Sequence, residues 1–165
     1  MKTLILVRHA KSSWDEPGIS DIDRPLNERG KKDAPEMAKR LKDKDLKVDL
    51  FVSSTAKRAK RTARFFAEAF DKDKDDIRIV EDLYMASPDA FRKAILTLKN
   101  SDDVVAFFAH NPGITEFANS LTNVRIDDMP TCAMFAVQIE AAKWEEFENA
   151  DKKFLFFDYP KNPLP

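Results

Sequence analysis

The sequence predicts one α/β domain, over residues 1–165, with a mostly parallel central sheet and helices on both faces of that sheet. Two observations support this prediction. Short apolar runs, typical of strands buried on both faces, alternate along the chain with segments whose apolar residues recur at helical spacing. Such alternation is typical of strand–helix–strand crossovers, which join parallel strands. A chain of 165 residues is also long enough to bury one core of ordinary size.

The first strand is predicted over residues 3–7, which are uncharged and include three β-branched side chains. After a polar loop, Asn27 has the character of an N-cap, and the next apolar residues share one face of a helix that should end near Asp43. Pro35 should start or kink this helix, because proline lacks the N–H that a helix interior needs. The residues of the apolar face are Ala34, Met37, Ala38 and Leu41.

The second and third strands are predicted over residues 48–53 and 77–80. Between them we expect Ser54 and Thr55 to cap a helix, which places Arg58 in its first turn. The inward face of this helix should consist of Ala59, Ala63, Phe66 and Phe70.

The second half of the chain continues the same alternation. Ser87 and Pro88 should open a helix before a buried strand at residues 104–108, and Asn111 should cap a further helix that Pro112 opens. Two more strands are expected at residues 131–139 and 154–159, with Trp144 and Phe147 on a short helix between them and a loose tail at residues 160–165.

Composition narrows the classes of partner. The chain has 28 basic and 29 acidic side chains, so no basic field favours nucleic acid or a membrane surface. No apolar run reaches the roughly 18 residues of a membrane span, no signal peptide is recognised, and we expect a cytoplasmic protein. Cys132 is the single cysteine and should be a small buried apolar residue, because one thiol and two histidines favour neither a disulfide nor a metal site.

Polar side chains follow four of the predicted strands where each strand ends. Arg8 and His9 follow the first, Arg58 lies just past the second, Glu81 ends the third and His110 follows the fourth. Taken alone, an Arg–His pair can be the start of a solvated loop, but parallel strands would bring all these residues to one edge of the sheet. Two guanidinium groups suit phosphate oxygens, and two imidazoles can attack phosphorus and donate to an oxygen. The sequence therefore predicts phosphoryl transfer without a metal or another cofactor.

The segment at residues 8–14 (RHAKSSW) resembles the RHGxSxW signature of the histidine phosphatase superfamily, and its RHAKS form is similar to the branch named after the phosphohistidine phosphatase SixA. The resemblance covers nearly the whole chain and implies a phosphoglycerate mutase-like fold. Its other motifs are residues 54–63 (STAKRAKRTA), similar to SPxxRAxxTA; residues 109–113 (AHNPG), similar to the second-histidine turn; and residues 23–26 (DRPL), Gly30 and residues 129–131 (MPT), similar to the SixA-like branch.

The resemblance implies a role for each matching residue. Arg8 would bind phosphate, and His9 would be the nucleophile that becomes phosphohistidine. Arg58, not Arg61, would be the second arginine, and His110 would complete the pocket. This division suits the chemistry, because imidazole attacks only as the neutral ring whereas arginine keeps its charge at any working pH.

Other residues near these motifs are more ambiguous. The resemblance assigns Ser12 to substrate binding, and relatives that hydrolyse esters place a glutamate general acid where Glu81 stands, although Glu81 could equally face water. Asp15 is left out of the site, because a carboxylate there would repel a phosphate dianion. Asn111 follows His110 where the acid-phosphatase branch has aspartate, which disfavours that branch.

We therefore expect a metal-independent phosphatase that removes phosphate from phosphohistidine on a protein. The alternatives are a phosphomonoesterase for a small metabolite and a module that binds phosphate without turnover, which would not need a nucleophile. The expected partner is a phosphorylated protein or a small phosphoester, not nucleic acid or a membrane, and a monomer is expected. No connection is long enough to form a lid, so the pocket should be open and shallow.

Overall fold

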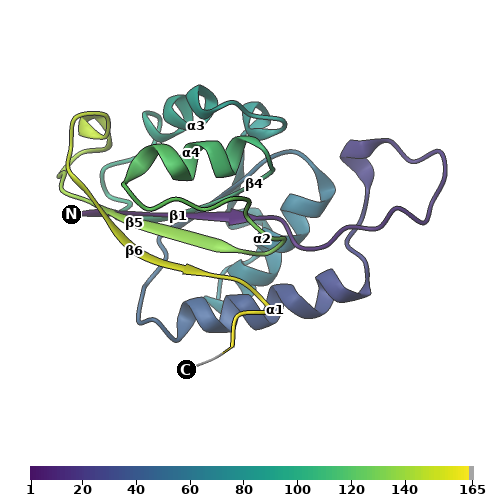
Figure 1. The fold of residues 1–165 in the computed structure, drawn as a ribbon. Helices are drawn as coiled ribbons and strands as arrows, with labels where there is room; N and C mark the ends of the chain where they lie inside the picture. Colours follow the sequence, from purple (N-terminus) through teal and green to yellow (C-terminus); the bar gives the residue numbers. More distant parts are fainter. Residues whose placement is uncertain (164–165) are drawn as a thin grey trace.

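The computed structural model describes residues 1–163, which form one six-stranded sheet covered by four α-helices (Figure 1). Leu164 and Pro165, the end of the predicted tail and domain, lie outside the described residues. The strands are β1 (Lys2–Arg8), β2 (Leu50–Ser53), β3 (Ile77–Ile79), β4 (Val104–Ala109), β5 (Met134–Ile139) and β6 (Lys152–Asp158). The helices are α1 (Glu28–Lys42), α2 (Lys57–Ala69), α3 (Pro88–Ile95) and α4 (Gly113–Leu121).

The strand order across the sheet is β3-β2-β4-β1-β5-β6. Strands β1, β4, β2 and β3 are parallel neighbours, whereas β5 runs antiparallel to both β1 and β6. Helices α3 and α4 cover one face, and α1 and α2 cover the other (Figure 1). The prediction of a mostly parallel sheet between two helical layers is therefore confirmed.

Strand β1 lies in the middle of the sheet and contributes to a hydrophobic core on each face. Its side chains alternate, so that Leu4 and Leu6 pack in the core beneath α3 and α4 while Ile5 and Val7 pack in the core beneath α1 and α2. All four side chains are fully buried. Because both faces are covered, the strand reads as a continuous apolar run, which explains why it was recognisable in the sequence.

The predicted helix starts are partly confirmed. The side chain of Asn27 caps α1 by accepting the Gly30 N–H at 2.8 Å, and Ser87 and Pro88 open α3 as expected. Pro35 does not start α1, which continues through it. Pro35 lies on the exposed side of the helix, where solvent can reach the carbonyl that loses its partner.

Two predicted caps are wrong. Ala56, not Ser54 or Thr55, is the N-cap of α2, and Pro112, not Asn111, is the N-cap of α4. In both cases the polar side chain has another partner. The Ser54 hydroxyl is hydrogen-bonded to His110, and the Asn111 amide donates to Asp128.

Strand β5 begins at Met134, three residues later than predicted. Cys132 has a φ of 62°, and its N–H donates to the carbonyls of Arg8 and His9 at 3.1 and 3.0 Å. This left-handed residue interrupts the extended backbone and ties the segment to the end of β1. Cys132 is fully buried, as expected.

Among residues 1–163, no helix combines the length and apolar character that crossing a membrane requires.

Candidate active site

The two histidines meet because β1 and β4 are parallel neighbours in register. Arg8 pairs with Ala109 across the sheet, and the His9 N–H donates to the Ala109 carbonyl at 3.1 Å. The next residue on each strand therefore leaves the sheet at the same point, and the ring centroids of His9 and His110 lie 5.1 Å apart. The topology alone thus places two imidazoles side by side at the carboxyl edge.

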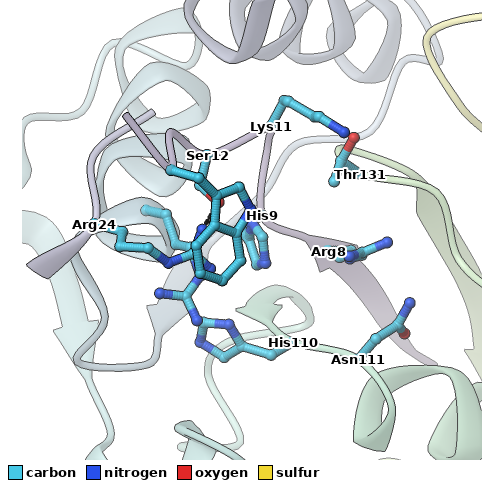
Figure 2. Close-up of a pocket in the computed structure, with 10 residues that line it drawn as sticks. Arg8, His9, Lys11, Ser12, Arg24, His110, Asn111 and Thr131 are labelled. Carbon is cyan, nitrogen blue, oxygen red and sulfur yellow. Dashed lines mark hydrogen bonds between the residues drawn. The ribbon is translucent and has the colours of Figure 1, made fainter. Parts of the chain in front are cut away.

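A pocket of about 220 Å³ opens at this edge, between the β1–α1 loop and the start of α4 (Figure 2). The structure brings Arg8, His9 and Ser12 together there with Arg58 and His110. Among the described residues, the lining is Arg8, His9, Lys11, Ser12, Trp14, Arg24, Arg58, His110, Asn111 and Thr131.

The imidazole of His9 is held as a neutral ring with one nitrogen available. Its Nδ1 lies 2.8 Å from the Ala10 carbonyl, which can only accept, so Nδ1 carries the hydrogen and Nε2 keeps its lone pair. Burial lowers the pKa of His9 to about 3, and the charges of His110, Arg58 and Arg8 act in the same direction. At neutral pH, His9 is therefore an uncharged ring whose Nε2 can act as a nucleophile.

The ring of His110 is fixed by Ser54. Its Nε2 lies 2.7 Å from the Ser54 Oγ, and that oxygen also accepts the Ala56 N–H at 3.3 Å. The Ser54 hydrogen is therefore available for Nε2, which leaves the hydrogen of the neutral His110 ring on Nδ1. Burial, followed by the charge of Arg58, lowers the pKa of His110 to about 4.

Three buried donors on side chains that line this pocket have no partner among the described residues: Arg8 Nε, Arg58 Nε and His110 Nδ1. Another nitrogen of each arginine is held in place. Arg8 Nη1 donates to the Met129 carbonyl at 2.8 Å, and Arg58 Nη1 donates to the Asp21 carbonyl at 2.6 Å. An unpaired buried donor costs about 1–3 kcal/mol, so three at one place favour an acceptor-rich anion there.

A third arginine of the site was missed by the sequence analysis. Arg24 donates through Nη1 to the Ser12 Oγ at 2.8 Å, and its guanidinium carbon lies 3.4 Å from the centroid of the Trp14 ring. The signal was present in the DRPL motif at residues 23–26. Arg24 comes from a loop, however, and strand-end reasoning cannot place a loop residue.

The carboxylate of Asp21, also missed, connects two of these arginines. It accepts from Arg24 Nε at 3.1 Å, from Arg58 Nη2 at 3.0 Å and from the Tyr84 hydroxyl at 2.5 Å. The Tyr84 hydrogen bond, followed by Arg58, lowers the pKa of Asp21 to about 2 and raises that of Tyr84. Asp21 is therefore ionised at neutral pH and can position the arginines but cannot donate a proton.

Three residues considered in the sequence lie away from the pocket. Glu81 begins a 3-10 turn after β3, is exposed and does not line the pocket. Strand β3 is the edge strand, so β2 and β4 separate its end from that of β1. Asp15 is exposed. Arg61 lies one turn of α2 beyond Arg58, with its guanidinium carbon 5.8 Å from the centroid of the Phe65 ring.

The fold and the pocket at its sheet edge are those of an α/β phosphatase. Residues 4–84 match the model of the histidine phosphatase superfamily (branch 1), which supports the assignment of the chain to that superfamily. The activity that this match supports is hydrolysis of phosphorylated substrates. The resemblance seen in the sequence motifs is thereby confirmed.

Curated relatives agree with this family. An uncharacterized chloroplastic protein of Arabidopsis thaliana is 29% identical over 153 residues, which cover 88% of this chain and 70% of that protein. Phosphoserine phosphatase 1 of Hydrogenobacter thermophilus is 44% identical over 85 residues, which cover 49% of this chain and 39% of that enzyme.

Solved structures of SixA proteins have the same fold. SixA from Agrobacterium tumefaciens aligns with a TM-score of 0.80 at 24% identity, covering 96% of this chain and 98% of that chain. The protein histidine phosphatase SixA in complex with tungstate also aligns with a TM-score of 0.80, at 19% identity, covering 96% of this chain and 97% of that one.

Proposed function

We propose that this protein removes phosphate from phosphohistidine on a protein, through a phosphohistidine intermediate on His9. The observation that supports this most strongly is the set of three unpaired buried donors, Arg8 Nε, Arg58 Nε and His110 Nδ1, whose side chains line the same pocket as a neutral His9 ring. A phosphoryl group supplies acceptor oxygens for all three donors. Its phosphorus would then lie within reach of the His9 Nε2 lone pair.

In the first step, the lone pair of His9 Nε2 forms a bond to phosphorus while the bond from phosphorus to the substrate nitrogen breaks. The bonding pair leaves with the substrate imidazole, which takes a proton from solvent. Arg8 and Arg58 hold the equatorial oxygens, and His110 Nδ1 donates to one of them. These groups stabilise the charge on the transferring phosphoryl group, which is the main contribution of a protein to such reactions.

In the second step, water attacks the phosphorus bound to His9, the bond between Nε2 and phosphorus breaks, and inorganic phosphate leaves. A proton from the water is released to solvent or to the leaving phosphate. Covalent transfer thus divides one hydrolysis into two easier displacements. Because the guanidinium groups supply the positive charge, we expect a chelator to leave turnover unchanged.

The lining of the pocket favours phosphohistidine over an ester. Among the described residues that line it, none has a carboxyl group, and the nearby Asp21 is ionised. An alkoxide leaving group needs a general acid, which contributes about a hundredfold to ten-thousandfold, whereas imidazole can be protonated by solvent before the bond breaks. The exposed position of Glu81 matches the alternative that this side chain faces water.

A second candidate function is hydrolysis of a small phosphomonoester. The specific observation in its favour is the similarity to phosphoserine phosphatase 1 of Hydrogenobacter thermophilus, which is 44% identical over 85 residues. Turnover on a phosphorylated histidine protein, compared with turnover on a panel of small phosphoesters, separates the two candidates. Efficient hydrolysis of one metabolite at micromolar concentration would favour the second.

The central test is a trapping experiment on His9. Brief reaction with labelled phosphohistidine protein, followed by denaturation without acid, should leave an acid-labile label on the wild-type protein and none on His9→Ala. His110→Asn is the matched control, because it removes the other imidazole and should label more slowly but at the same site. A label that resists acid, or that persists in His9→Ala, would contradict the assignment.

A further inference from the structure

A second cavity, of about 340 Å³, lies beside the active-site pocket and shares two lining residues with it, Lys11 and Thr131. Figure 2 shows these two side chains next to each other on the side of the pocket away from His110. The two cavities are therefore adjacent, with Lys11 and Thr131 at their boundary. The second cavity is lined by Lys11, Arg29, Pro130, Thr131, Tyr159, Pro160 and Lys161.

The walls of the second cavity come from distant segments that are fixed to one another. The Lys11 carbonyl accepts the Asn27 N–H at 3.0 Å, which ties the β1–α1 loop to the start of α1. On the opposite wall, Arg40 Nη1 donates to the carbonyls of Tyr159 and Asn162, each at 3.1 Å. Lys161 thus lies between two residues that α1 holds in place.

The charge of the second cavity is positive. Lys11, Arg29 and Lys161 line it, and no acidic side chain of the described residues does. Arg29 has an i,i+4 partner in Asp33, with Nε and Oδ2 3.4 Å apart. Within residues 1–163, no ion pair is formed by Lys11 or Lys161. A ligand that enters this cavity therefore meets at least two uncompensated ammonium groups.

We propose that this cavity binds the carboxylate of an Asp or Glu side chain that lies near the phosphorylated histidine of the protein substrate. This proposal rests on the proposed function and adds a preference to it. A substrate that fills both cavities must extend across the boundary formed by Lys11 and Thr131, which a peptide segment does and a compact phosphoester does not. The rings of Pro130, Tyr159 and Pro160 give that segment an apolar surface beside the cations.

The test compares two phosphohistidine peptides that differ only in having Glu or Gln beside the phosphorylated residue. The wild-type protein should prefer the Glu peptide about tenfold in kcat/KM, because two exposed charge contacts contribute up to about fivefold each. The double variant Arg29→Ala, Lys161→Ala should reduce this preference severalfold, because Lys11 is then the only cation left among the described residues of the lining. Raising the salt concentration should weaken it in the wild-type protein, because exposed charges are screened.

The matched control is the double variant Arg64→Ala, Lys93→Ala, which should keep the preference. Arg64 has an i,i+4 partner in Glu68, as Arg29 has in Asp33, and Lys93 is exposed like Lys161. Equal kcat/KM for both peptides in the wild-type protein, or a preference that the Arg29 and Lys161 changes leave undiminished, would overturn the subsite.

Failure of the underlying function has a different signature. If neither peptide is hydrolysed, the protein substrate is wrong, and small phosphoesters with and without a second carboxylate become the decisive comparison. Loss of a carboxylate preference among those esters in Arg29→Ala, Lys161→Ala would assign the cavity to a metabolite and overturn the proposed source of the carboxylate.

Discussion

Arg58 and Arg61 have the same charge and lie on the same helix, but only Arg58 lines the active-site pocket. Three residues along an α-helix correspond to a rotation of about 300° and a rise of about 4.5 Å, so the two side chains cannot share one site. Arg58→Ala should therefore reduce kcat/KM about a hundredfold or more, the usual effect of losing a donor to the transition state.

Steady-state kinetics of the two variants provides the measurement, with Arg61→Ala as the control for charge and helix position. We expect Arg61→Ala to stay close to the wild-type protein. Equal losses of kcat/KM in both variants would instead mean that Arg58 acts through its positive charge at a distance and not through contact with phosphate.

Ser54 is a positioning residue that the sequence analysis assigned to a helix cap. Its hydroxyl is the partner of His110 Nε2, so Ser54→Ala should release the ring and allow hydrogen to occupy either nitrogen. We expect kcat to fall roughly tenfold with little change in KM, and the loss of one buried hydrogen bond to cost about 1–2 kcal/mol of stability.

Ser53→Ala is the matched control, because the Ser53 hydroxyl is equally buried but donates to the Ser54 carbonyl at 2.9 Å and does not contact a histidine. The ¹⁵N chemical shifts of His110 report the tautomer directly. A fixed Nδ1–H tautomer in Ser54→Ala would show that another group orients this ring.

The β1–α1 loop depends on a close approach between Lys11 and the first turn of α1. A Cβ atom at Gly30 would lie 2.1 Å from the Lys11 carbonyl oxygen, so no side chain fits without moving the loop. Gly30→Ala should destabilise the protein by about 1–3 kcal/mol, the usual cost of forcing a group into a packed site. Activity should fall with it, because Lys11 and Ser12 line the pocket on this loop.

Urea unfolding and kcat/KM measure both effects, and Gly18→Ala separates backbone strain from displacement of the loop. Gly18 has a φ of 91°, but a Cβ atom there meets nothing within 4 Å. Gly18→Ala should therefore cost about 1–2 kcal/mol and leave activity intact. A stable, active Gly30→Ala protein would mean that the loop can move without disturbing the pocket.

Segments whose apolar residues face a hydrophobic core were predictable, because burial alone selects those residues. Strands β1 and β4 and the inward faces of α1 and α2 match the predicted segments for this reason. The caps of α2 and α4 were mispredicted because Ser54 and Asn111 have tertiary partners, which outcompete the local capping preference. The start of β5 was missed because the left-handed backbone of Cys132 has no signature in a non-glycine residue.

The candidate site also combines residues whose positions could be predicted from the sequence with residues whose positions depend on tertiary contacts. The positions of Arg8, His9 and His110 could be predicted from the sequence, because parallel strands end at the same edge of the sheet and the residues that follow them lie there together. Whether Glu81 lies near His9 could not be read from the sequence, because strand order is a long-range property and its strand is the edge strand. Arg24 lines the pocket, and Asp21 contacts its arginines, from a segment that hydrogen-bonds to Tyr84, 63 residues away along the chain.

In the molecule as a whole, the sheet separates two hydrophobic cores, and the chemistry is confined to the edge where four parallel strands end. Both histidines of the chain lie at this edge. Stability near neutral pH is therefore linked to the site, because no other side chain type has an ordinary pKa between about 5 and 8. Protonation of the two pocket histidines should therefore be measurable as a change in the free energy of unfolding.

Burial, followed by neighbouring positive charges, lowers the pKa of His9 to about 3 and that of His110 to about 4, while the hydrogen bond to the Ala10 carbonyl acts on His9 in the opposite direction. In the unfolded chain, both imidazoles bind protons below about pH 6.5, whereas in the folded protein they remain neutral until the pH reaches those lower values. Between these limits the unfolded state binds more protons, so acid favours unfolding. From about pH 7 to about pH 5, the free energy of unfolding should fall by roughly 4 kcal/mol, about half from each ring.

Urea unfolding at a series of pH values measures this slope, and His110→Asn should reduce it by about half whatever its own baseline stability. Carboxylates contribute little in this window, since their ordinary pKa values lie near 4 and that of Asp21 is lower still, at about 2. Saturating inorganic phosphate should reduce this fall in the free energy of unfolding, because an anion bound in the pocket favours the charged imidazoles of the folded protein. A flat profile between about pH 7 and about pH 5 would show that both rings take up protons in the folded state, and His9 would then not be the neutral nucleophile that the mechanism requires.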